Sequence, residues 1–345
     1  MVKIDFNKAF NSSMNYMSSI LFKPFIFRKW LALGFVAMLA GFGSGGSGGG
    51  GNSGSNTSSW GRSVDKMSPD IGTYLHQYLW LILLGVGLII ILCFIFTWLA
   101  SVFKFVYTDQ LVRNSMEIKE PFARLKGLGT SYFLWTIAFG LAFLLSLLVI
   151  VGIPALIAYK TYYTSTALSI GCIVIGSLLF IMLAIVGGVI DIFARDFVIT
   201  TMYVKNLRII EAWRTVIPVI KANKGQIALY ILLLIVIAIA SGIISIFIMI
   251  AAVIIMAIPV GILVGLSLLI ALAASLTWNA FTIASVSILS VIMLFVFSTL
   301  LVCLMQPLLV FRRVFALQVL GQLDPDLATI DVINTMTPSS QPPIS

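Results

Sequence analysis

The sequence has 345 residues, of which 60% are hydrophobic and only 10% are charged, whereas a soluble domain carries about 25% charged residues. So little charge cannot cover a water-soluble surface, and the composition excludes a soluble globular protein, a disordered chain and a nucleic-acid-binding domain. The net charge of +9 is expected from Lys and Arg that flank membrane spans. We therefore predict an all-α, polytopic transmembrane helix bundle of about six spans, with amphipathic interfacial helices on the cytoplasmic side and a candidate internal repeat.

Residues 1–24 are predicted to form an N-terminal amphipathic interfacial helix. Apolar residues recur at helical spacing, and charged and amide residues occupy the other positions. Packing of this helix on the protein's own loops is an equal alternative to the membrane surface. Residues 25–43 form the first candidate span, although their apolar part, 30–42, is shorter than the roughly 20 residues that a span needs. The apolar residues of the first helix are Ile4, Phe6, Phe10, Met14, Met17 and Leu21.

A Gly/Ser-rich linker at 44–76 follows, and its composition indicates a flexible extracytoplasmic tether. Residues 77–311 are predicted to form the transmembrane helix bundle, with cytoplasmic helices at 104–130 and 191–225. Its spans are expected at 77–103, 131–153, 166–190, 226–257 and 282–308, and residues 258–281 could be re-entrant, spanning or buried. Residues 312–345 are expected to form a cytoplasmic C-terminal helix and a disordered tail.

The distribution of Lys and Arg orients the chain. They concentrate in residues 1–29, 104–130 and 191–225, and recur at Arg312 and Arg313, and the positive-inside rule assigns these segments to the cytoplasm. We therefore expect a multi-pass protein in the cytoplasmic membrane of a prokaryote, with both termini cytoplasmic. Close packing of spans is predicted at the small-residue pairs Gly261/Gly265 and Ala238/Gly242.

The two charged segments resemble one another, which indicates a parallel internal repeat. Each begins with Phe-Val, and each carries an Asn at the same later offset and ends at a Gly before an apolar span. Chance similarity between segments of like composition is the alternative. The matching stretches are 105–106 with 197–198, and 111–114 with 203–206.

The helix predicted within 191–225 carries the first candidate site. An apolar stripe of Leu207, Ile210, Trp213, Ile217 and Ile220 is predicted to lie flat against span ends, with Trp213 buried. Basic residues on the other face are candidate contacts for anionic lipid headgroups, and an ordinary solvated face is the alternative. These residues are Arg208, Arg214, Lys221 and Lys224.

A cluster of ionisable residues ends the span at 166–190. Asp191 and Arg195 are four residues apart, so they can pair on one helix face, and Asp196 follows. The cluster is predicted to be a structural ion pair, and a headgroup or ion site is the alternative.

Few residues are suited to chemistry. Cys93, Cys172 and Cys303 each lie in an apolar run, and His76 is the single histidine, so no set has the spacing of a zinc site or a catalytic triad. Residues 43–49 match the glycine patterns of dinucleotide-binding and nucleophile-elbow motifs. They lack the preceding strand and the following helix that those motifs require. We therefore expect no enzymatic activity, no cofactor and no metal.

Several motifs resemble a family of uncharacterised prokaryotic membrane proteins that is similar to the membrane domain of glycerophosphodiester phosphodiesterases. The catalytic barrel of those enzymes is absent here, so the resemblance implies no catalysis. The motifs are Asp196-Phe197-Val198, Ala212-Trp213-Arg214 and Ala228-Leu229-Tyr230, with Leu21-Phe22-Lys23-Pro24-Phe25 near the start and Phe311-Arg312 near the end.

These observations favour a non-enzymatic integral membrane protein that organises anionic lipid or a partner through its cytoplasmic amphipathic helices. A passive transporter or channel for a small solute or lipid is the alternative. Membrane lipids are the expected partners and nucleic acid is not, while a protein partner or a homo-oligomer is left open.

Overall fold

The computed structural model describes residues 4–23, 25–41, 71–161, 165–273 and 280–328, and within these ranges it is helical throughout apart from short connections. Most of the predicted linker and of the C-terminal tail lies outside the described residues. The elements are α1 (Phe6–Phe22), α2 (Phe27–Gly41), α3 (Ile71–Arg113), α4 (Lys119–Ile150), α5 (Gly152–Thr161), α6 (Thr166–Phe193), the π-helical turn η2 (Ala194–Val198), α7 (Ile199–Lys205), α8 (Ile209–Ala222), α9 (Lys224–Ala273), α10 (Ala280–Leu304), α11 (Gln306–Leu323) and the 3₁₀ turn η3 (Pro325–Leu327).

Five helical segments in the described ranges are long and apolar enough to cross a membrane. The prediction of an all-α polytopic membrane protein is therefore confirmed. The sixth predicted span is not among them, because α2 has only 15 residues, fewer than the roughly 20 that cross a bilayer. The five segments are Leu83–Arg113, Lys119–Thr161, Thr166–Lys205, Lys224–Ile258 and Ser287–Leu304.

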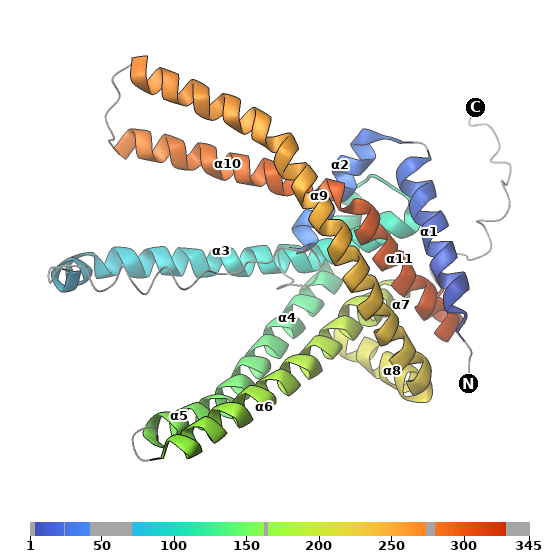
Figure 1. Cartoon of the computed structure of the whole chain (residues 1–345). Helices are drawn as coiled ribbons and strands as arrows, with labels where there is room; N and C mark the ends of the chain where they lie inside the picture. Colours follow the sequence, from blue (N-terminus) through green and yellow to red (C-terminus); the bar gives the residue numbers. More distant parts are fainter. Residues whose placement is uncertain (1–3, 24, 42–70, 162–164, 274–279, 329–345) are drawn as a thin grey trace.

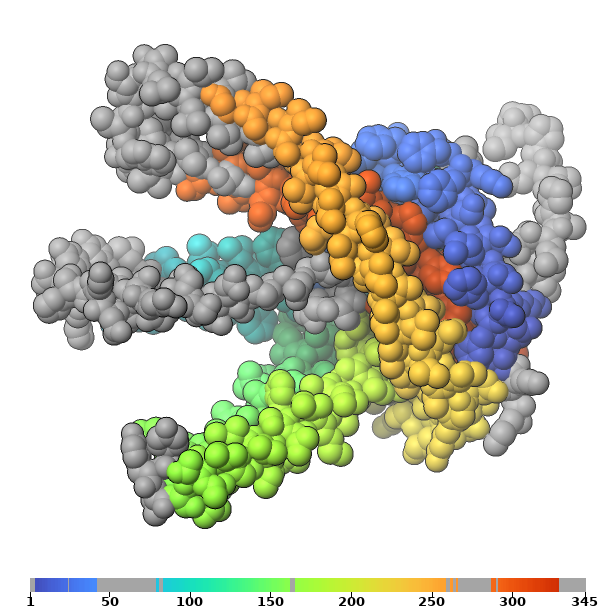
Figure 2. Space-filling view, viewed as in Figure 1, coloured from blue at the N-terminus to red at the C-terminus, as the bar shows by residue number. Residues whose placement is uncertain are grey.

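The long helices spread as three arms from a common base (Figure 1). One arm is the pair α9 and α10, the second is α3, and the third is α4 with α5 and α6. The base consists of α1, α2, α7, α8 and α11 with the adjoining ends of the long helices. Large apolar side chains along the arms are exposed, and the arms are separated on the face that Figure 2 shows. The core of the fold therefore lies in the base, and the arms present apolar surface of the kind that lipid covers.

Helix α11 lies at the centre of the base. Its residues contribute to both hydrophobic clusters of the molecule: Phe315 and Leu320 pack with α4, α7 and α8, and Val310 and Leu317 pack with α2 and α3. The predicted C-terminal helix from residue 312 therefore needs correction. The helix begins at Gln306, directly after α10, and it is mostly buried within the fold.

Helix α1 packs against α11, and its buried residues are Ala9, Ser13, Ile20 and Leu21. The Asp5 carboxylate caps the helix by accepting from the backbone N–H of Lys8 at 3.0 Å. Phe10 and Met14, part of the predicted apolar stripe, are 38% and 42% exposed. The helix therefore packs on the protein with one side and presents apolar side chains with another.

The two charged segments differ in structure. Residues 104–130 form no separate helix, because they are the end of α3 and the start of α4, joined by a turn at 114–118. Residues 191–225 do contain a separate helix, α8, between the ends of α6–α7 and the start of α9. Of residues 258–281, for which the sequence allows a re-entrant, spanning or buried segment, 258–273 continue α9 as helix, 280–281 begin α10, and 274–279 lie outside the described residues.

The predicted close packing at Gly261/Gly265 and Ala238/Gly242 is wrong. A Cβ added at Gly242, Gly261 or Gly265 would meet no atom within 4 Å, so these positions lie on open faces of the α9 arm. The close approach occurs elsewhere: a Cβ at Gly129 of α4 would lie 2.6 Å from the Cα atom of Val102 in α3. Small residues are therefore used where α4 crosses α3 at the base.

Candidate functional site

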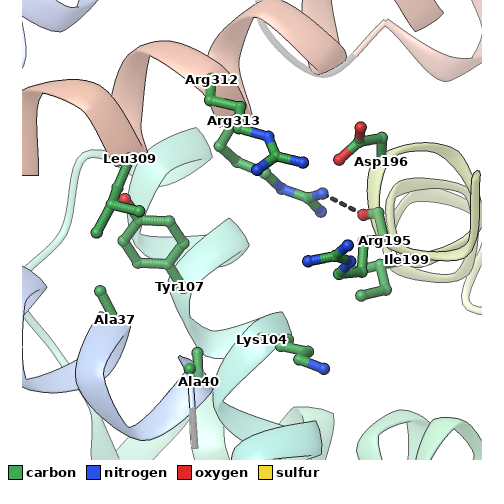
Figure 3. A pocket seen from close by; sticks show the side chains of 11 residues that line it. Ala37, Ala40, Lys104, Tyr107, Arg195, Asp196, Ile199, Leu309, Arg312 and Arg313 are labelled. Atoms are coloured by element: carbon green, nitrogen blue, oxygen red, sulfur yellow. Dashed lines mark hydrogen bonds between the residues drawn. The ribbon is translucent and has the colours of Figure 1, made fainter. Parts of the chain in front are cut away.

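A cavity of about 140 Å³ opens in the base between α2, α3, η2, α7 and α11. Figure 3 shows the guanidinium groups of Arg312 and Arg313 reaching from α11 toward Arg195 and Asp196, while Lys104 of α3 lies at the other side of the cavity, with its ammonium over the Tyr132 ring. Four of its lining side chains are cationic and one is a carboxylate. The remaining lining residues are Ala37, Ala40, Gly41, Tyr107, Ile199 and Leu309.

The cavity lies where the apolar runs of the chain end. Lys104 is the first Lys, Arg, Asp or Glu after the start of α3, Asp191 is the first after Lys160, and Arg312 is the first after Lys224. Three segments run from the arm tips toward the base, namely α3, α6 and α10 continued by α11, and each reaches its first charge at or beside the cavity. The charges of the cavity are therefore placed where an apolar environment gives way to a polar one.

Arg313 holds the elements around the cavity together. Its guanidinium donates to the backbone carbonyl of Arg195, to Thr108 Oγ1 at 2.9 Å and to Thr200 Oγ1 at 3.4 Å. Burial lowers the pKa of Arg313, and the negative charge of Asp196 acts in the opposite direction. The side chain thus joins α11 to α3 and to η2–α7 through charge-assisted hydrogen bonds.

The threonines that Arg313 contacts occupy equivalent positions in the predicted repeat. Thr108 and Thr200 are separated by the same offset as Phe105 and Phe197. The asparagines that end the matched stretches, Asn114 and Asn206, are also at this offset, and among the described non-glycine residues they alone have positive φ, of 53° and 51°. These shared features support the internal repeat.

The predicted cluster of Asp191, Arg195 and Asp196 separates into two parts. Arg195 pairs with the Asp191 carboxylate at 2.5 Å, as the spacing predicts. Asp196 is buried and accepts a hydrogen bond from the Tyr230 hydroxyl at 3.0 Å. The first pair lies beside the cavity, and Asp196 links η2 to α9.

A second buried charge lies nearby but serves the packing of helices. Asp109 of α3 is fully buried and contacts Arg124 of α4 at 2.5 Å and Arg113 at 3.2 Å. The Tyr203 hydroxyl of α7 donates to the same carboxylate at 2.7 Å. The four-residue spacing of Asp109 and Arg113 is a sequence signal for that pair alone. Arg124 and Tyr203 come from other helices, so the sequence did not indicate the whole cluster.

Helix α8 is amphipathic, but its buried face differs from the predicted stripe. Ile209, Ala212 and Val216 are buried, whereas Ile210 and Ile217 are 63% and 40% exposed. The difference arises because apolar residues occur on both sides of this helix, so periodicity alone does not select the buried one.

Trp213 of α8, which the sequence predicts to be buried, is partly buried. Its ring lies against that of Trp135 in α4, with centroids 5.8 Å apart. The candidate headgroup contacts Arg208, Arg214, Lys221 and Lys224 are all exposed. None of the four lines the cavity, so the structure holds two separate basic regions, and Lys104, Arg312 and Arg313 were not singled out as site residues by the sequence.

Among the described residues, no group of three or more His, Cys, Asp or Glu side chains is placed to hold a metal ion. The architecture defines a multi-pass helical membrane protein with a basic cavity at the base of its arms. A model described as a family of unknown function (DUF7544) matches residues 6–330, and the protein belongs to this family. No curated protein and no solved structure matches the sequence. Nothing in these comparisons supports the expected similarity to the membrane domain of glycerophosphodiester phosphodiesterases.

Proposed function

We propose that the protein is a non-enzymatic integral membrane protein whose base associates with anionic lipid on the cytoplasmic face of a prokaryotic cell membrane. The exposed face of α8 carries the proposal. Ile210, Arg214, Ile217 and Lys221 follow one another at spacings of three or four residues, so they share one side of the helix. A face that alternates large apolar and basic side chains suits the headgroup region, because the apolar groups enter the acyl boundary and the charges stay at the phosphates.

The arrangement of the base supports the orientation. Helices α1 and α11 pack together, so both terminal helices lie on one side of the arms. The Lys- and Arg-rich segments gather on this same side, which the positive-inside rule assigns to the cytoplasm.

A role without catalysis is favoured because the ionisable residues of the base hold helices together. Arg124 and Arg313 each contact a residue of another helix, and Arg195 pairs with Asp191. The alternative of a passive transporter or channel has less support. The arms spread apart (Figure 2), and few side chains of the candidate spans are buried, so the described spans do not pack around a common path.

The test replaces Arg208, Arg214, Lys221 and Lys224 with Gln. Each basic residue near an anionic surface contributes about 1 kcal/mol, so the loss of four is expected to lower retention of phosphatidylglycerol by the purified variant, measured by native mass spectrometry, about tenfold or more. The control exchanges Arg and Lys at the same four positions, which keeps the charge and should keep the lipid. Unchanged retention in the Gln variant would remove the lipid role of α8.

A further inference from the structure

Helix α2, which is too short to be a span, carries its charges at one end. Arg28 and Lys29 lie in its first turn, Lys23 lies shortly before it, and residues 30–41 contain no Asp, Glu, Lys or Arg. At a rise of about 1.5 Å per residue, this uncharged part is about 17 Å long, roughly half of the ~30 Å hydrocarbon core of a bilayer. Such a helix suits a segment whose basic end lies at the headgroups and whose remainder lies among acyl chains.

The contacts of the basic end place it at the base of the arms. Lys29 is buried, and its Nζ donates to Oδ1 of Asn114, directly after the end of α3, at 2.5 Å. The hydroxyl of Tyr16 in α1 donates to the backbone carbonyl of Leu111 in α3 at 2.8 Å. Helix α2 therefore begins beside the point where α3 ends.

The contacts further along α2 are with a membrane span. Gly34 lies against Cys303, since a Cβ added at Gly34 would overlap the Cys303 Sγ atom. One turn later, the Sδ atom of Met38 lies 3.2 Å from Oγ1 of Thr299. Both partners belong to the candidate span Ser287–Leu304 of α10. Helix α2 thus runs antiparallel to α10, from the base toward the arm, and its second half lies at the depth of the span.

One side of α2 has large apolar side chains that no part of the protein covers. Phe27, Leu31 and Phe35 follow one another at a spacing of four residues, and they are 66%, 42% and 37% exposed. They therefore form one stripe along the helix. Because α2 lies beside α10, the stripe continues the apolar surface of the arm toward the base, which is the kind of surface that lipid covers.

The corner between α1 and α2 places more aromatic side chains at the basic end. The Trp30 indole N–H donates to the backbone carbonyl of Leu21 at 2.9 Å. The rings of Phe22 and Phe25 lie against the Trp30 ring, with centroids 5.8 Å and 5.6 Å away, and both side chains are exposed. Aromatic and basic side chains together are typical of the boundary between headgroups and acyl chains.

The far end of α2 meets the basic cavity. Ala40 and Gly41, in its last turn, line the cavity together with Lys104 and Arg313. The last carbonyl groups of a helix lack partners within the helix, and at membrane depth they are tolerated where they face protein or a polar cavity. Cationic side chains are also favourable near a helix C-terminus. The cavity therefore allows α2 to end inside the bilayer.

We propose that α2 is a half-membrane helix, which enters the cytoplasmic leaflet beside α10 and places Phe27, Leu31 and Phe35 against lipid acyl chains. Lys23 and Arg28, which are both exposed, lie at the headgroups. The partner is the acyl region of the leaflet, and no particular headgroup is required. The inference is therefore independent of the association with anionic lipid that we propose for α8.

The experiment measures the depth of α2 in liposomes of phosphatidylcholine, which has no net charge. The native cysteines of the full-length protein are replaced by alanine, and a nitroxide label is attached to Phe27→Cys, Leu31→Cys or Phe35→Cys. Accessibility of the label to oxygen, relative to a water-soluble nickel chelate, should increase in that order. Four residues of helix rise by about 6 Å, so each step should deepen the label by up to about 6 Å.

Two reference positions bracket these values. Val291→Cys, on α10 and 66% exposed, should report lipid, and Glu117→Cys, exposed in the turn between α3 and α4, should report water. Thermal unfolding of each labelled variant confirms that it is folded. Chelate accessibility on α2 equal to that at position 117, or depths that do not increase along α2, would overturn the half-membrane helix.

Two further measurements separate lipid from other occupants and from α8. Broadening of the α2 spectra that disappears on dilution with unlabelled protein would show that a second copy covers the stripe, and would overturn the assignment to lipid. With the label at position 31, the four Gln substitutions that test α8 should leave the depth unchanged. Loss of phosphatidylglycerol in that variant with an unchanged depth would support both proposals, each by its own readout.

Discussion

Asn114 and Asn206 have backbone conformations that most side chains avoid. Their φ angles of 53° and 51° lie in the left-handed region, where Asn is tolerated better than other residues that carry a Cβ. Asn114 directly follows α3 and Asn206 directly follows α7. Each residue therefore turns the chain from the end of one helix toward the start of the next in both halves of the repeat.

The two positions are expected to respond differently to glycine. Asn206→Gly should keep or raise the unfolding temperature, because glycine adopts positive φ without strain, whereas Asn206→Val should lower stability by about 1–2 kcal/mol. Asn114→Gly should be destabilising, since Asn114 Oδ1 accepts a hydrogen bond from Lys29 Nζ at 2.5 Å. Thermal unfolding in detergent, followed by tryptophan fluorescence, measures all three. A valine at 206 that is tolerated as well as glycine would contradict this account.

At the scale of elements, the crossing of α3 and α4 depends on one glycine. The absence of a side chain at Gly129 lets α4 approach the backbone of α3 at Val102. Nearby, the Trp98 indole of α3 donates to Thr130 Oγ1 of α4 at 3.0 Å. The Asp109–Arg124 ion pair joins the same two helices. The crossing of α3 and α4 is therefore fixed by close packing and by polar contacts together.

Two glycines on α4 provide a matched test of this crossing. Gly129→Ala should destabilise the protein by about 1–3 kcal/mol, because the added methyl would overlap Val102. Gly127→Ala, two residues earlier, meets nothing within 4 Å and should be neutral or stabilising by up to about 1 kcal/mol, as alanine favours helix. The free energy of unfolding in mixed micelles checks both. Equal effects of the two substitutions would mean that the helices separate more easily than the structure indicates.

At the scale of the whole molecule, the base gathers both terminal helices and the charged segments on one side of the arms. In a background with the native cysteines replaced by alanine, Lys8→Cys on α1 and Lys221→Cys on α8 should react with an impermeant maleimide only after the cells are opened. Lys160→Cys, at the end of α5, should react in intact cells. A cysteine at Ser53, which lies outside the described residues, should behave like the one at Lys160. Labelling of position 8 in intact cells would reverse the orientation.

The sequence predicted the arms well and the base less well. A span is apolar on all of its sides, so it can be located from composition without deciding which side of the helix is buried. The buried face of α8 depended on which of two apolar sides meets the core, and Ile210 and Ile217 turned out to be exposed. The cavity could not be predicted, since it combines Lys104, Arg195 and Arg312, which are distant in sequence. In the sequence, Arg312 is a marker of orientation and part of the Phe311-Arg312 motif, not a predicted site residue.

The contacts of α11 have a consequence for the order in which the molecule forms. The first helix, α1, packs on α11, and Asp5 and Gln322 exchange backbone-to-side-chain hydrogen bonds across 317 positions of sequence. Arg313 reaches both Thr108 and Thr200. A chain made from its N-terminus therefore inserts all of its arms before the helix that joins them has left the ribosome. Until α11 has been made, α1, Thr108 and Thr200 lack the contacts that it provides, so the base can close only after all of the arms have been synthesised.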